Sequence, residues 1–377
     1  MSKRARVLII ENSRHVTGAL KSICAMAVDL RDDFEFFMIV PSGSAAVEWI
    51  KSTSGIHVIE LPMREISRSW RVLFYLPVLL SNARRVMLII KERKIDIIHS
   101  NDLYNLIGPV LKSSGVKSSY ICHVRFLPGG FPAWLYNYWV KRQLSAADRL
   151  IAVSDALKRQ LPPDHKVIMI HDRIMLSSPV EPASKRNGNT ILYLSNIIPG
   201  KGHDYVIMAF AEVYKKFPSW KLRIVGGDMN LDKNREYREK LKTTAAEKGI
   251  SGAIEWSDFV ADVASEYKSA DIFANFSSSE SFSMTCLEAQ YYGCCVVATN
   301  SGGPAEIIDN GKSGFLVPVG DVNAMVKSLT DLMSNAALRE SMGTEGSRIV
   351  RDKFGAEKTS GALRSLYLNL LTTKGDH

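Results

Sequence analysis

Residues 271–289 read DIFANFSSSESFSMTCLEA, a short apolar run followed by small polar residues and then by an apolar pattern of helical period. The run 271–275 is typical of a buried strand, and the pattern that begins near Ser283 predicts a helix. A helix start exposes unpaired N–H groups and a partial positive charge, which suit a diphosphate. The stretch therefore predicts an anion site with a carboxylate in the loop, Glu280, and another in the helix, Glu288.

Apolar, β-branched runs alternate with helical patterns on both sides of this stretch. Before residue 176 we expect strands at 6–10, 36–40, 58–61, 95–99, 120–124, 150–153 and 167–170, and helices near 16–29, 72–93, 103–113 and 133–146. After residue 189 we expect strands at 190–194, 222–225, 254–256, 271–275, 295–298 and 315–317, and closing helices near 322–334, 336–352 and 356–372. Such alternation predicts an α/β protein with parallel, doubly wound sheets.

A chain of 377 residues exceeds the size at which one hydrophobic core usually stops growing. The polar stretch 177–189, with prolines and no apolar period, is interpreted as a linker. We therefore expect two Rossmann-like domains at 1–180 and 190–355, with a helix at about 356–377 that packs back on the first. Open α/β sheets bind ligands at the carboxyl ends of their strands, so the two domains are expected to face a central cleft.

Charge is unevenly distributed. The net charge of +9 divides into +10 for residues 1–175 and −1 for the remainder. A basic patch of this kind indicates an acidic partner, such as an anionic membrane surface or a phosphorylated acceptor, or else a solvated surface without a partner. Nucleic acid is not expected, because the cations are scattered among aliphatic helices and are not interleaved with exposed aromatic residues.

Neither a secretory signal core nor an apolar stretch long enough for a membrane span is evident in the sequence. The five cysteines form no C-x-x-C pair. We therefore expect a cytoplasmic protein, with peripheral contact to the inner face of the plasma membrane.

The spacing of Glu280 and Glu288, with Phe282 and Ser283 between them, resembles the E-x7-E motif of retaining glycosyltransferases with the GT-B fold, family 4. The resemblance implies that Glu280 contacts the donor sugar and that Glu288 contacts the ribose of the nucleotide. It also implies that backbone amides hold the sugar and phosphate; these belong to Ser281, Phe282, Ser283 and Met284. Thr285 to Glu288 also match a capping box, in which Glu288 would only satisfy the first helical turn.

Four further segments resemble the family in the same order: 195–204, 222–227, 302–308 and 310–317. In the first, the family holds the donor diphosphate with an arginine and, five residues later, a lysine; this chain has Asn196 and Lys201. In the second segment, 222–227, Gly227 lies in the glycine turn. Over the amino-terminal half the resemblance is looser, and it implies that His123 faces the acceptor side of the reacting sugar. A packed or capping histidine is the alternative.

Asn196 is a departure from that pattern, and losing one charge-assisted hydrogen bond costs roughly 1.5–3 kcal/mol. Donor binding is expected to be weaker by that amount unless Arg125, Arg173 or Lys166 substitutes from across the cleft. Asp172 stands where relatives have an Asn-Gly pair, at a backbone position that is expected to be left-handed. The loop 11–18 holds only Gly18 where many relatives have two adjacent glycines.

The chain has no D-x-D triplet and no His/Cys cluster with metal-ligand spacing. We therefore expect no metal requirement and no cofactor, the nucleotide-diphosphate sugar being the donor substrate. The resemblance implies retention at the anomeric carbon, with the donor phosphate helping to remove the acceptor proton. Other sugar-nucleotide chemistry, such as epimerisation, and a non-catalytic GT-B protein are the alternatives; a nicotinamide dehydrogenase is disfavoured because no G-x-G-x-x-G follows the first strand.

Two basic segments of the amino-terminal half bear on the acceptor. Arg64, Arg68, Arg71, Arg84, Arg85, Lys91, Arg93 and Lys94 surround the apolar run 73–80, and residues 131–142 mix aromatic residues with cations. Such segments are typical of a membrane interface, and also of helices that pack an apolar stripe on a sheet. The acceptor is expected to be a glycan or lipid-linked, in bacterial cell-surface polysaccharide or lipopolysaccharide synthesis.

Overall fold

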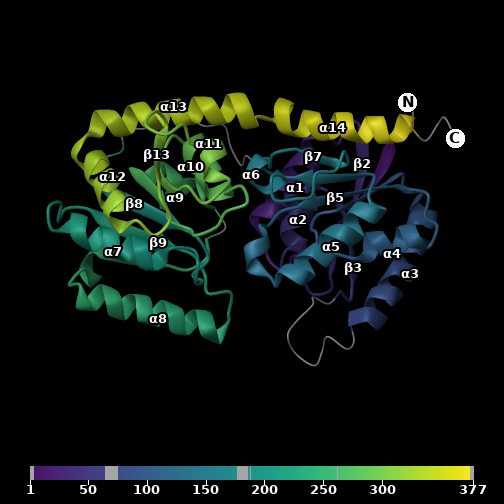
Figure 1. Cartoon of the computed structure of the whole chain (residues 1–377), viewed down its shortest axis with the longest axis horizontal. Coiled ribbons are helices and arrows are strands. Elements are labelled where there is room, and N and C mark those ends of the chain that lie inside the picture. The colour runs from purple at the N-terminus through teal and green to yellow at the C-terminus, as the bar shows by residue number, and fades with distance from the viewer. Residues whose placement is uncertain (1–3, 64–74, 176–185, 187, 261, 374–377) are drawn as a thin grey trace. The chain divides into compact units, whose positions relative to one another are not determined.

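The computed structural model describes residues 4–63, 75–175, 186, 188–260 and 262–373. The chain divides into two compact units, the first formed by Met1–Met175 with Phe354–His377 and the second by Leu176–Lys353. Each unit holds one fully parallel sheet with helices packed against it (Figure 1). Most of the predicted linker 177–189 and the cations Arg64, Arg68 and Arg71 lie outside the described residues.

Unit 1 has seven strands in the order β3-β2-β1-β4-β5-β6-β7. They are β1 (Ala5–Ile10), β2 (Phe34–Pro41), β3 (His57–Leu61), β4 (Ile97–Ser100), β5 (Ser119–Val124), β6 (Arg149–Ala152) and β7 (Val167–Met169). Its helices are α1 (Gly18–Asp29), α2 (Val47–Ser54), α3 (Tyr75–Arg93), α4 (Ile107–Ser113), α5 (Ala133–Ala146), α6 (Asp155–Lys158) and α14 (Ala356–Thr372), with a 3-10 turn η2 (Pro128–Gly130). Each strand expected from the sequence is present, which confirms the doubly wound order.

Unit 2 has six strands in the order β10-β9-β8-β11-β12-β13. They are β8 (Thr190–Leu194), β9 (Lys221–Val225), β10 (Ile254–Ser257), β11 (Ile272–Asn275), β12 (Cys295–Thr299) and β13 (Gly314–Val317). Its helices are α7 (His203–Tyr214), α8 (Asp232–Glu247), α9 (Ala264–Ser269), α10 (Met284–Tyr291), α11 (Pro304–Ile307), α12 (Val322–Ser334) and α13 (Ala336–Phe354), with a 3-10 turn η3 (Ser251–Ala253). The two units thus repeat one topology without repeating a sequence.

The carboxyl-terminal helix α14 belongs to the packing of unit 1, where it lies beside α1 (Figure 1). Ser360 Oγ donates to Asp29 Oδ2 at 2.6 Å, and the Arg364 guanidinium donates to both carboxylate oxygens of Asp33 at 2.7 and 2.8 Å. Tyr367 is fully buried within the core that β1 and β2 build. The last helix therefore completes the first unit after the chain has formed the second.

Helix α4 begins at Ile107, four residues later than the helix predicted at 103–113. The cause is local, because the Asn105 side chain accepts from the Ile107 amide at 2.9 Å and so occupies the start of the helix. Residues 101–106 consequently form a loop at the carboxyl end of β4, beside the loop that follows β1. That position is the switch point of the unit 1 sheet, where the strand order reverses.

Candidate active site

The loops after β8 and β11 meet at the switch point of the unit 2 sheet, since these two strands are neighbours on either side of the reversal. Ser278 joins the loops by donating from its amide and its hydroxyl to Gly200 O, at 2.9 and 3.0 Å. Gly202 has a φ of +74°, and a Cβ there would lie 2.2 Å from Phe276 O. Only glycine permits this approach, so the two loops are held in contact by their sequence.

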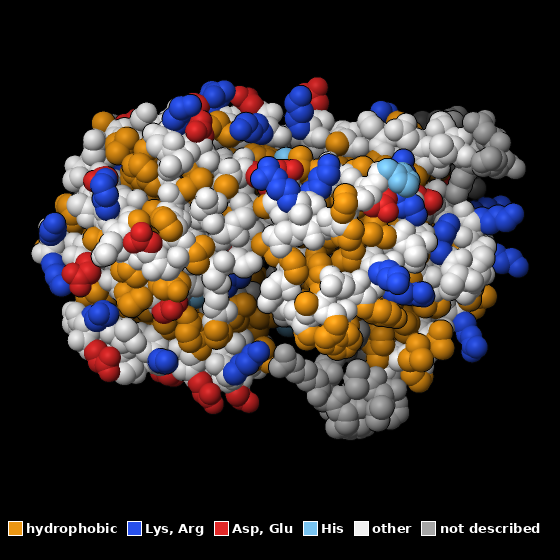
Figure 2. All heavy atoms as spheres, in the orientation of Figure 1, with side chains coloured by type: hydrophobic (Ala, Val, Ile, Leu, Met, Phe, Trp, Pro, Cys, Tyr) orange, Lys and Arg blue, Asp and Glu red, His pale blue; other side chains and the backbone are white. Residues whose placement is uncertain are grey.

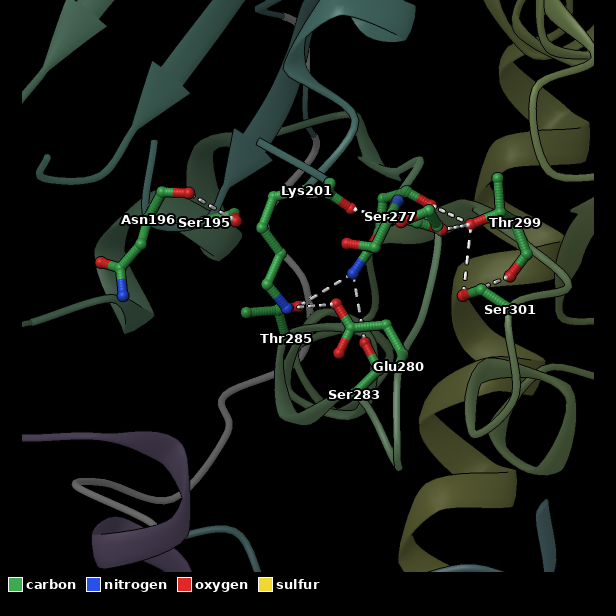
Figure 3. A network of polar contacts seen from close by, with 12 residues as sticks. Ser195, Asn196, Lys201, Ser277, Glu280, Ser283, Thr285, Thr299 and Ser301 are labelled. Atoms are coloured by element: carbon green, nitrogen blue, oxygen red, sulfur yellow. Dashed lines mark hydrogen bonds and ion pairs between the residues drawn. The ribbon is translucent and has the colours of Figure 1, made fainter. Parts of the chain in front are cut away.

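Lys201 and Glu280 form an ion pair at this junction (Figure 3). Lys201 Nζ donates to Glu280 Oε1 at 2.8 Å, and the side chains are 32% and 13% exposed. The position of Glu280 is fixed through its backbone, because its amide donates to Ser301 O at 3.0 Å and its carbonyl accepts from Gly303 N at 2.9 Å. The site therefore places an ammonium and a carboxylate side by side on loops that are 79 residues apart in sequence.

Helix α10 begins at Met284, next to this pair, which confirms the predicted helix start near Ser283. Ser283 is the N-cap in a left-handed conformation with φ 80°, and its side chain makes no capping bond to the helix. Instead Ser283 Oγ accepts from Asn275 Nδ2 at 3.2 Å. The first-turn amides of α10 are thus left without a side-chain cap, and a helix start in that state suits an anion.

Phe282 contributes to this site through its backbone, because its side chain is 1% exposed and belongs to the core. Gly303 lies against it, and a Cβ on Gly303 would come within 2.2 Å of Phe282 Cα. This contact holds the backbone of residues 281–284 beside Glu280. Ser281 and Met284 are partly exposed, so ligand contact by this segment would be mainly through peptide groups.

Glu288 lies inside α10 and is 9% exposed. Its Oε2 accepts from the Tyr267 hydroxyl at 3.1 Å, and burial together with this carboxylate raises the pKa of Tyr267 well above its ordinary value. The capping-box interpretation is wrong, because Ser283 is the N-cap and Thr285 is already inside the helix. Glu288 is therefore oriented by a buried tyrosine and has no capping role.

Asn196 is exposed, and its side chain lies apart from the Lys201–Glu280 pair (Figure 3). Its neighbour Ile197 donates to Gly227 O at 2.9 Å, which joins the loop after β8 to the glycine turn after β9. In that turn Gly226 has a φ of +155°, and a Cβ there would meet Ser195 O at 1.9 Å. Gly227 and Asn196 are thereby brought to the same edge of the sheet as Lys201.

The three cations considered as substitutes for the missing arginine each have a partner inside unit 1. Arg125 and Asp172 form a buried ion pair whose side chains are 4% and 7% exposed. Arg173 Nε donates to Asp29 Oδ2 at 3.1 Å, and Lys166 Nζ donates to Leu144 O at 3.0 Å. The guanidinium of Arg125 is thus held by a carboxylate of its own unit.

Asp172 does not adopt the left-handed conformation that was expected of it. Its carboxylate is buried, where it accepts from Ser22 Oγ at 2.8 Å as well as from Arg125. Arg125 Nε also donates to Asn101 Oδ1 at 3.0 Å, and Asn101 Nδ2 donates to the Glu11 carboxylate. The sequence analysis did not predict this network. Glu11 directly follows a buried strand, and polar residues in that position were the signal used to find the candidate site after other strands.

His123 is fully buried near the carboxyl end of β5. Its Nδ1 is 2.6 Å from Nε2 of His99, a second fully buried histidine on β4 that sequence reasoning did not single out. Burial and the Arg125 charge lower the pKa of His123 well below its usual range and that of His99 to about 3. Both rings are therefore neutral at physiological pH.

Within the described residues no group of three or more His, Cys, Asp or Glu side chains could hold a metal ion. All five cysteines are buried free thiols. None of the helices in the described part of the chain has both the length and the apolar character needed to span a bilayer. These findings add no further chemical group to the site on unit 2.

The helices of the two basic segments bury an apolar stripe and also expose apolar side chains. Helix α3 buries Leu79, Ala83, Val86 and Ile90, and α5 buries Tyr136, Trp139 and Val140. On their outer faces, however, Leu76, Leu88 and Trp134 are 58%, 68% and 71% exposed. Figure 2 shows apolar side chains gathered on this surface of unit 1 among separate cations.

Two doubly wound parallel sheets, one of which carries a lysine, a carboxylate and an uncapped helix start at its switch point, fit the GT-B glycosyltransferase class. Residues 177–348 match the family model for glycosyl transferases group 1, and residues 21–171 match that for glycosyltransferase family 4. The two matches together span most of the chain. The chain therefore belongs to the group 1, family 4 glycosyltransferases.

Curated relatives and solved structures agree with this assignment. The chain is 30% identical over 48% of its length to an uncharacterized glycosyltransferase of Haemophilus influenzae, and 27% identical over 63% to the lipopolysaccharide core biosynthesis mannosyltransferase LpcC of Rhizobium leguminosarum. The matches cover 49% and 68% of those proteins, so the chain spans about half to two thirds of their length. Anabaena HepE in complex with UDP and glucose has the same fold, with a TM-score of 0.81 at 17% identity over 96% of this chain and 98% of that one.

Proposed function

We propose that the protein transfers a sugar from a nucleotide-diphosphate donor to a glycan or lipid-linked acceptor. The observation that carries the proposal is the ion pair of Lys201 and Glu280, 2.8 Å apart beside the uncapped start of α10. A lysine and helix amides together bind a diphosphate, and a carboxylate accepts hydrogen bonds from sugar hydroxyls. One small region of unit 2 thus supplies complementary groups for both parts of a nucleotide sugar.

We propose that different residues bind the sugar, the diphosphate and the ribose of the donor. Glu280 binds the reacting sugar, Lys201 and the amides of residues 281–284 bind the diphosphate, and Glu288 accepts from the ribose. Glu288 is suited to that role because Tyr267 holds one of its oxygens at 3.1 Å and so orients the carboxylate. Asn196 and Gly227 complete the edge of the site. With Asn196 in place of a cation, we assign most of the diphosphate charge to Lys201 and the helix.

We further propose retention at the anomeric carbon, with an oxygen of the departing diphosphate accepting the proton of the acceptor hydroxyl. In this step the bond between the anomeric carbon and the phosphate oxygen breaks, and the bond to the acceptor oxygen forms on the same face. No metal ion takes part in the proposal, because the sequence contains no D-x-D triplet. Anomeric analysis of the product tests the step, and an inverted linkage would refute it.

The acceptor is proposed to belong to bacterial surface polysaccharide or lipopolysaccharide synthesis. Relatives that support this include LpcC and the capsular polysaccharide glycosyltransferase CapM of Staphylococcus aureus, 26% identical over 49% of this chain. The exposed Trp134, Leu76 and Leu88, with the exposed Arg84 and Arg85 nearby on α3, suit contact with an anionic membrane. Flotation with anionic and neutral vesicles at low salt tests that contact, and failure to float with anionic vesicles would exclude it.

A thermal-shift screen against UDP, GDP and ADP sugars is the primary test. A donor at about a hundred times its dissociation constant stabilises the folded state by roughly 2.7 kcal/mol, which raises the unfolding temperature by about 5–10 °C. The stabilising donor is then incubated with candidate acceptors and the product is identified. No shift with any of the three would favour a non-catalytic protein, whereas conversion of the donor without an acceptor would favour an epimerase.

A further inference from the structure

Three buried side chains from separate elements form a hydrogen-bonded chain in unit 1. His99 Nδ1 is 2.7 Å from the Tyr367 hydroxyl of α14, and His99 Nε2 is 2.6 Å from His123 Nδ1. The two imidazole rings are stacked with centroids 4.7 Å apart, and Tyr367 meets His99 edge to face at 5.9 Å. All three residues are 0% exposed.

The hydrogen-bonded chain ends at His123 Nε2, which is buried and has no hydrogen-bond partner among the described residues. A buried polar atom without a partner costs about 1–3 kcal/mol, and such atoms call for a functional or ligand-dependent explanation. His123 lies one residue before the carboxyl end of β5, the edge of the sheet where open α/β folds bind ligands. A substrate oxygen reaching this nitrogen would satisfy it.

Two arrangements of protons are compatible with the distances. In the first, Tyr367 donates to His99 Nδ1, His99 Nε2 donates to His123 Nδ1, and His123 carries its proton on Nε2. In the second, His123 Nδ1 donates to His99 Nε2 and His99 Nδ1 donates to Tyr367. The second leaves the tyrosine O–H without an acceptor, because within the described part of the chain His99 is the only hydrogen-bond partner of that hydroxyl.

The first arrangement is therefore the more stable one, because it leaves only one buried donor unsatisfied, the Nε2–H of His123. Both rings are neutral in it. The charges around the pair reinforce neutrality, since Arg125 lies near both rings, and burial lowers the pKa of each histidine. Asp172 compensates the positive charge of Arg125.

Resting on the function proposed above, we propose that Tyr367 and His99 are positioning residues that hold His123 as a neutral Nε2–H tautomer, a hydrogen-bond donor to a substrate oxygen. A nitrogen in that state has no lone pair with which to remove a proton. His123 is thereby excluded as the general base for the acceptor hydroxyl. This tautomer is compatible with the proposal that an oxygen of the donor phosphate accepts that proton.

The tautomer is measured directly by two-bond ¹H–¹⁵N correlation spectra of the full chain labelled in its histidines, with His123 assigned by the signals lost in His123→Gln. The expected pattern has a protonated-type Nε2 and an unprotonated-type Nδ1, unchanged from pH 6 to pH 8. In Tyr367→Phe no hydroxyl donates to His99 Nδ1, so the direction of the hydrogen bonds between the two histidines is no longer set. The ratio of the Nε2–H to the Nδ1–H tautomer of His123 therefore falls about fivefold or more. An Nδ1–H tautomer in the unmodified protein would overturn the proposal, as would an unaltered ratio in Tyr367→Phe.

Tyr136→Phe is the matched control. This tyrosine of α5 is also buried in unit 1, at 2% exposure, and its hydroxyl has no hydrogen-bond partner among the described residues. We expect it to leave the His123 spectrum unchanged, and a shift in the control equal to that in Tyr367→Phe would contradict a specific role for Tyr367. The spectra require no activity, so a protein with the expected tautomer but without sugar transfer would refute the proposed function alone.

Discussion

Replacing Glu280 by glutamine is expected to move nucleotide binding and catalysis in opposite directions. Lys201 Nζ is held by Glu280 Oε1 at 2.8 Å, so a diphosphate must compete with that carboxylate for the ammonium. A charge-assisted hydrogen bond is worth about 1.5–3 kcal/mol, but Lys201 is 32% exposed, and solvent screening reduces the value to about 1 kcal/mol. Glu280→Gln should therefore bind the nucleoside diphosphate roughly fivefold more tightly.

Sugar transfer by the same variant should fall by roughly a hundredfold or more, if the carboxylate stabilises the reacting sugar in the transition state. Isothermal titration with the nucleoside diphosphate and a product-based rate assay measure the two effects. Glu212→Gln is the matched control, since Glu212 pairs with Lys215 at 2.6 Å on the exposed face of α7, and it should change neither quantity. Weaker nucleotide binding by Glu280→Gln, or full transfer activity, would refute the reasoning.

Three further predictions concern stability and metal dependence. Asp172→Asn leaves the Arg125 guanidinium buried without its counter-charge, so the free energy of unfolding should fall by about 3–5 kcal/mol in urea titrations; a loss below about 1 kcal/mol would contradict a buried ion pair. The unfolding free energy should also fall from pH 6.5 to pH 5, because burial lowers the pKa of His99 to about 3 and of His203 to about 4, so the unfolded chain binds more protons. Each histidine contributes about 1 kcal/mol per pH unit in that range, and equal stability at the two pH values would show that the rings are not buried neutral. Sugar transfer should persist in EDTA, and its loss with recovery on adding Mg²⁺ or Mn²⁺ would mean that a metal is required.

The strands and the long helices were predictable because their signals are local. Buried parallel strands such as β12 require continuous apolar runs, and α12 requires an apolar residue every three or four positions. The loop that carries Glu280 was predictable for the same reason, since small residues between a strand and a helix are visible without any knowledge of the fold. Helix α2 was missed because its eight residues offer only two buried positions, Val47 and Ile50.

Predictions failed where a distant partner controls the local conformation. A left-handed backbone was expected at Asp172, but Arg125 and Ser22 bind its carboxylate and hold the residue in an ordinary conformation. The reverse occurs at Ser283, where a residue other than glycine has a φ of +80° while Asn275 binds its hydroxyl. Arg125 and Ser22 lie 47 and 150 residues from Asp172, too far for a local pattern to reveal them, whereas Asn275 lies only 8 residues before Ser283.

The sequence by itself determined two doubly wound units and the strand, loop and helix around Glu280. These features follow from short-range periodicity and residue size, which operate between neighbours along the chain. Only the tertiary structure decided that Lys201 pairs with Glu280 across 79 residues and that Tyr367 reaches His99 across 268. Such pairs depend on strand order and on the return of α14 to unit 1, because three-dimensional packing brings together side chains that sequence proximity does not.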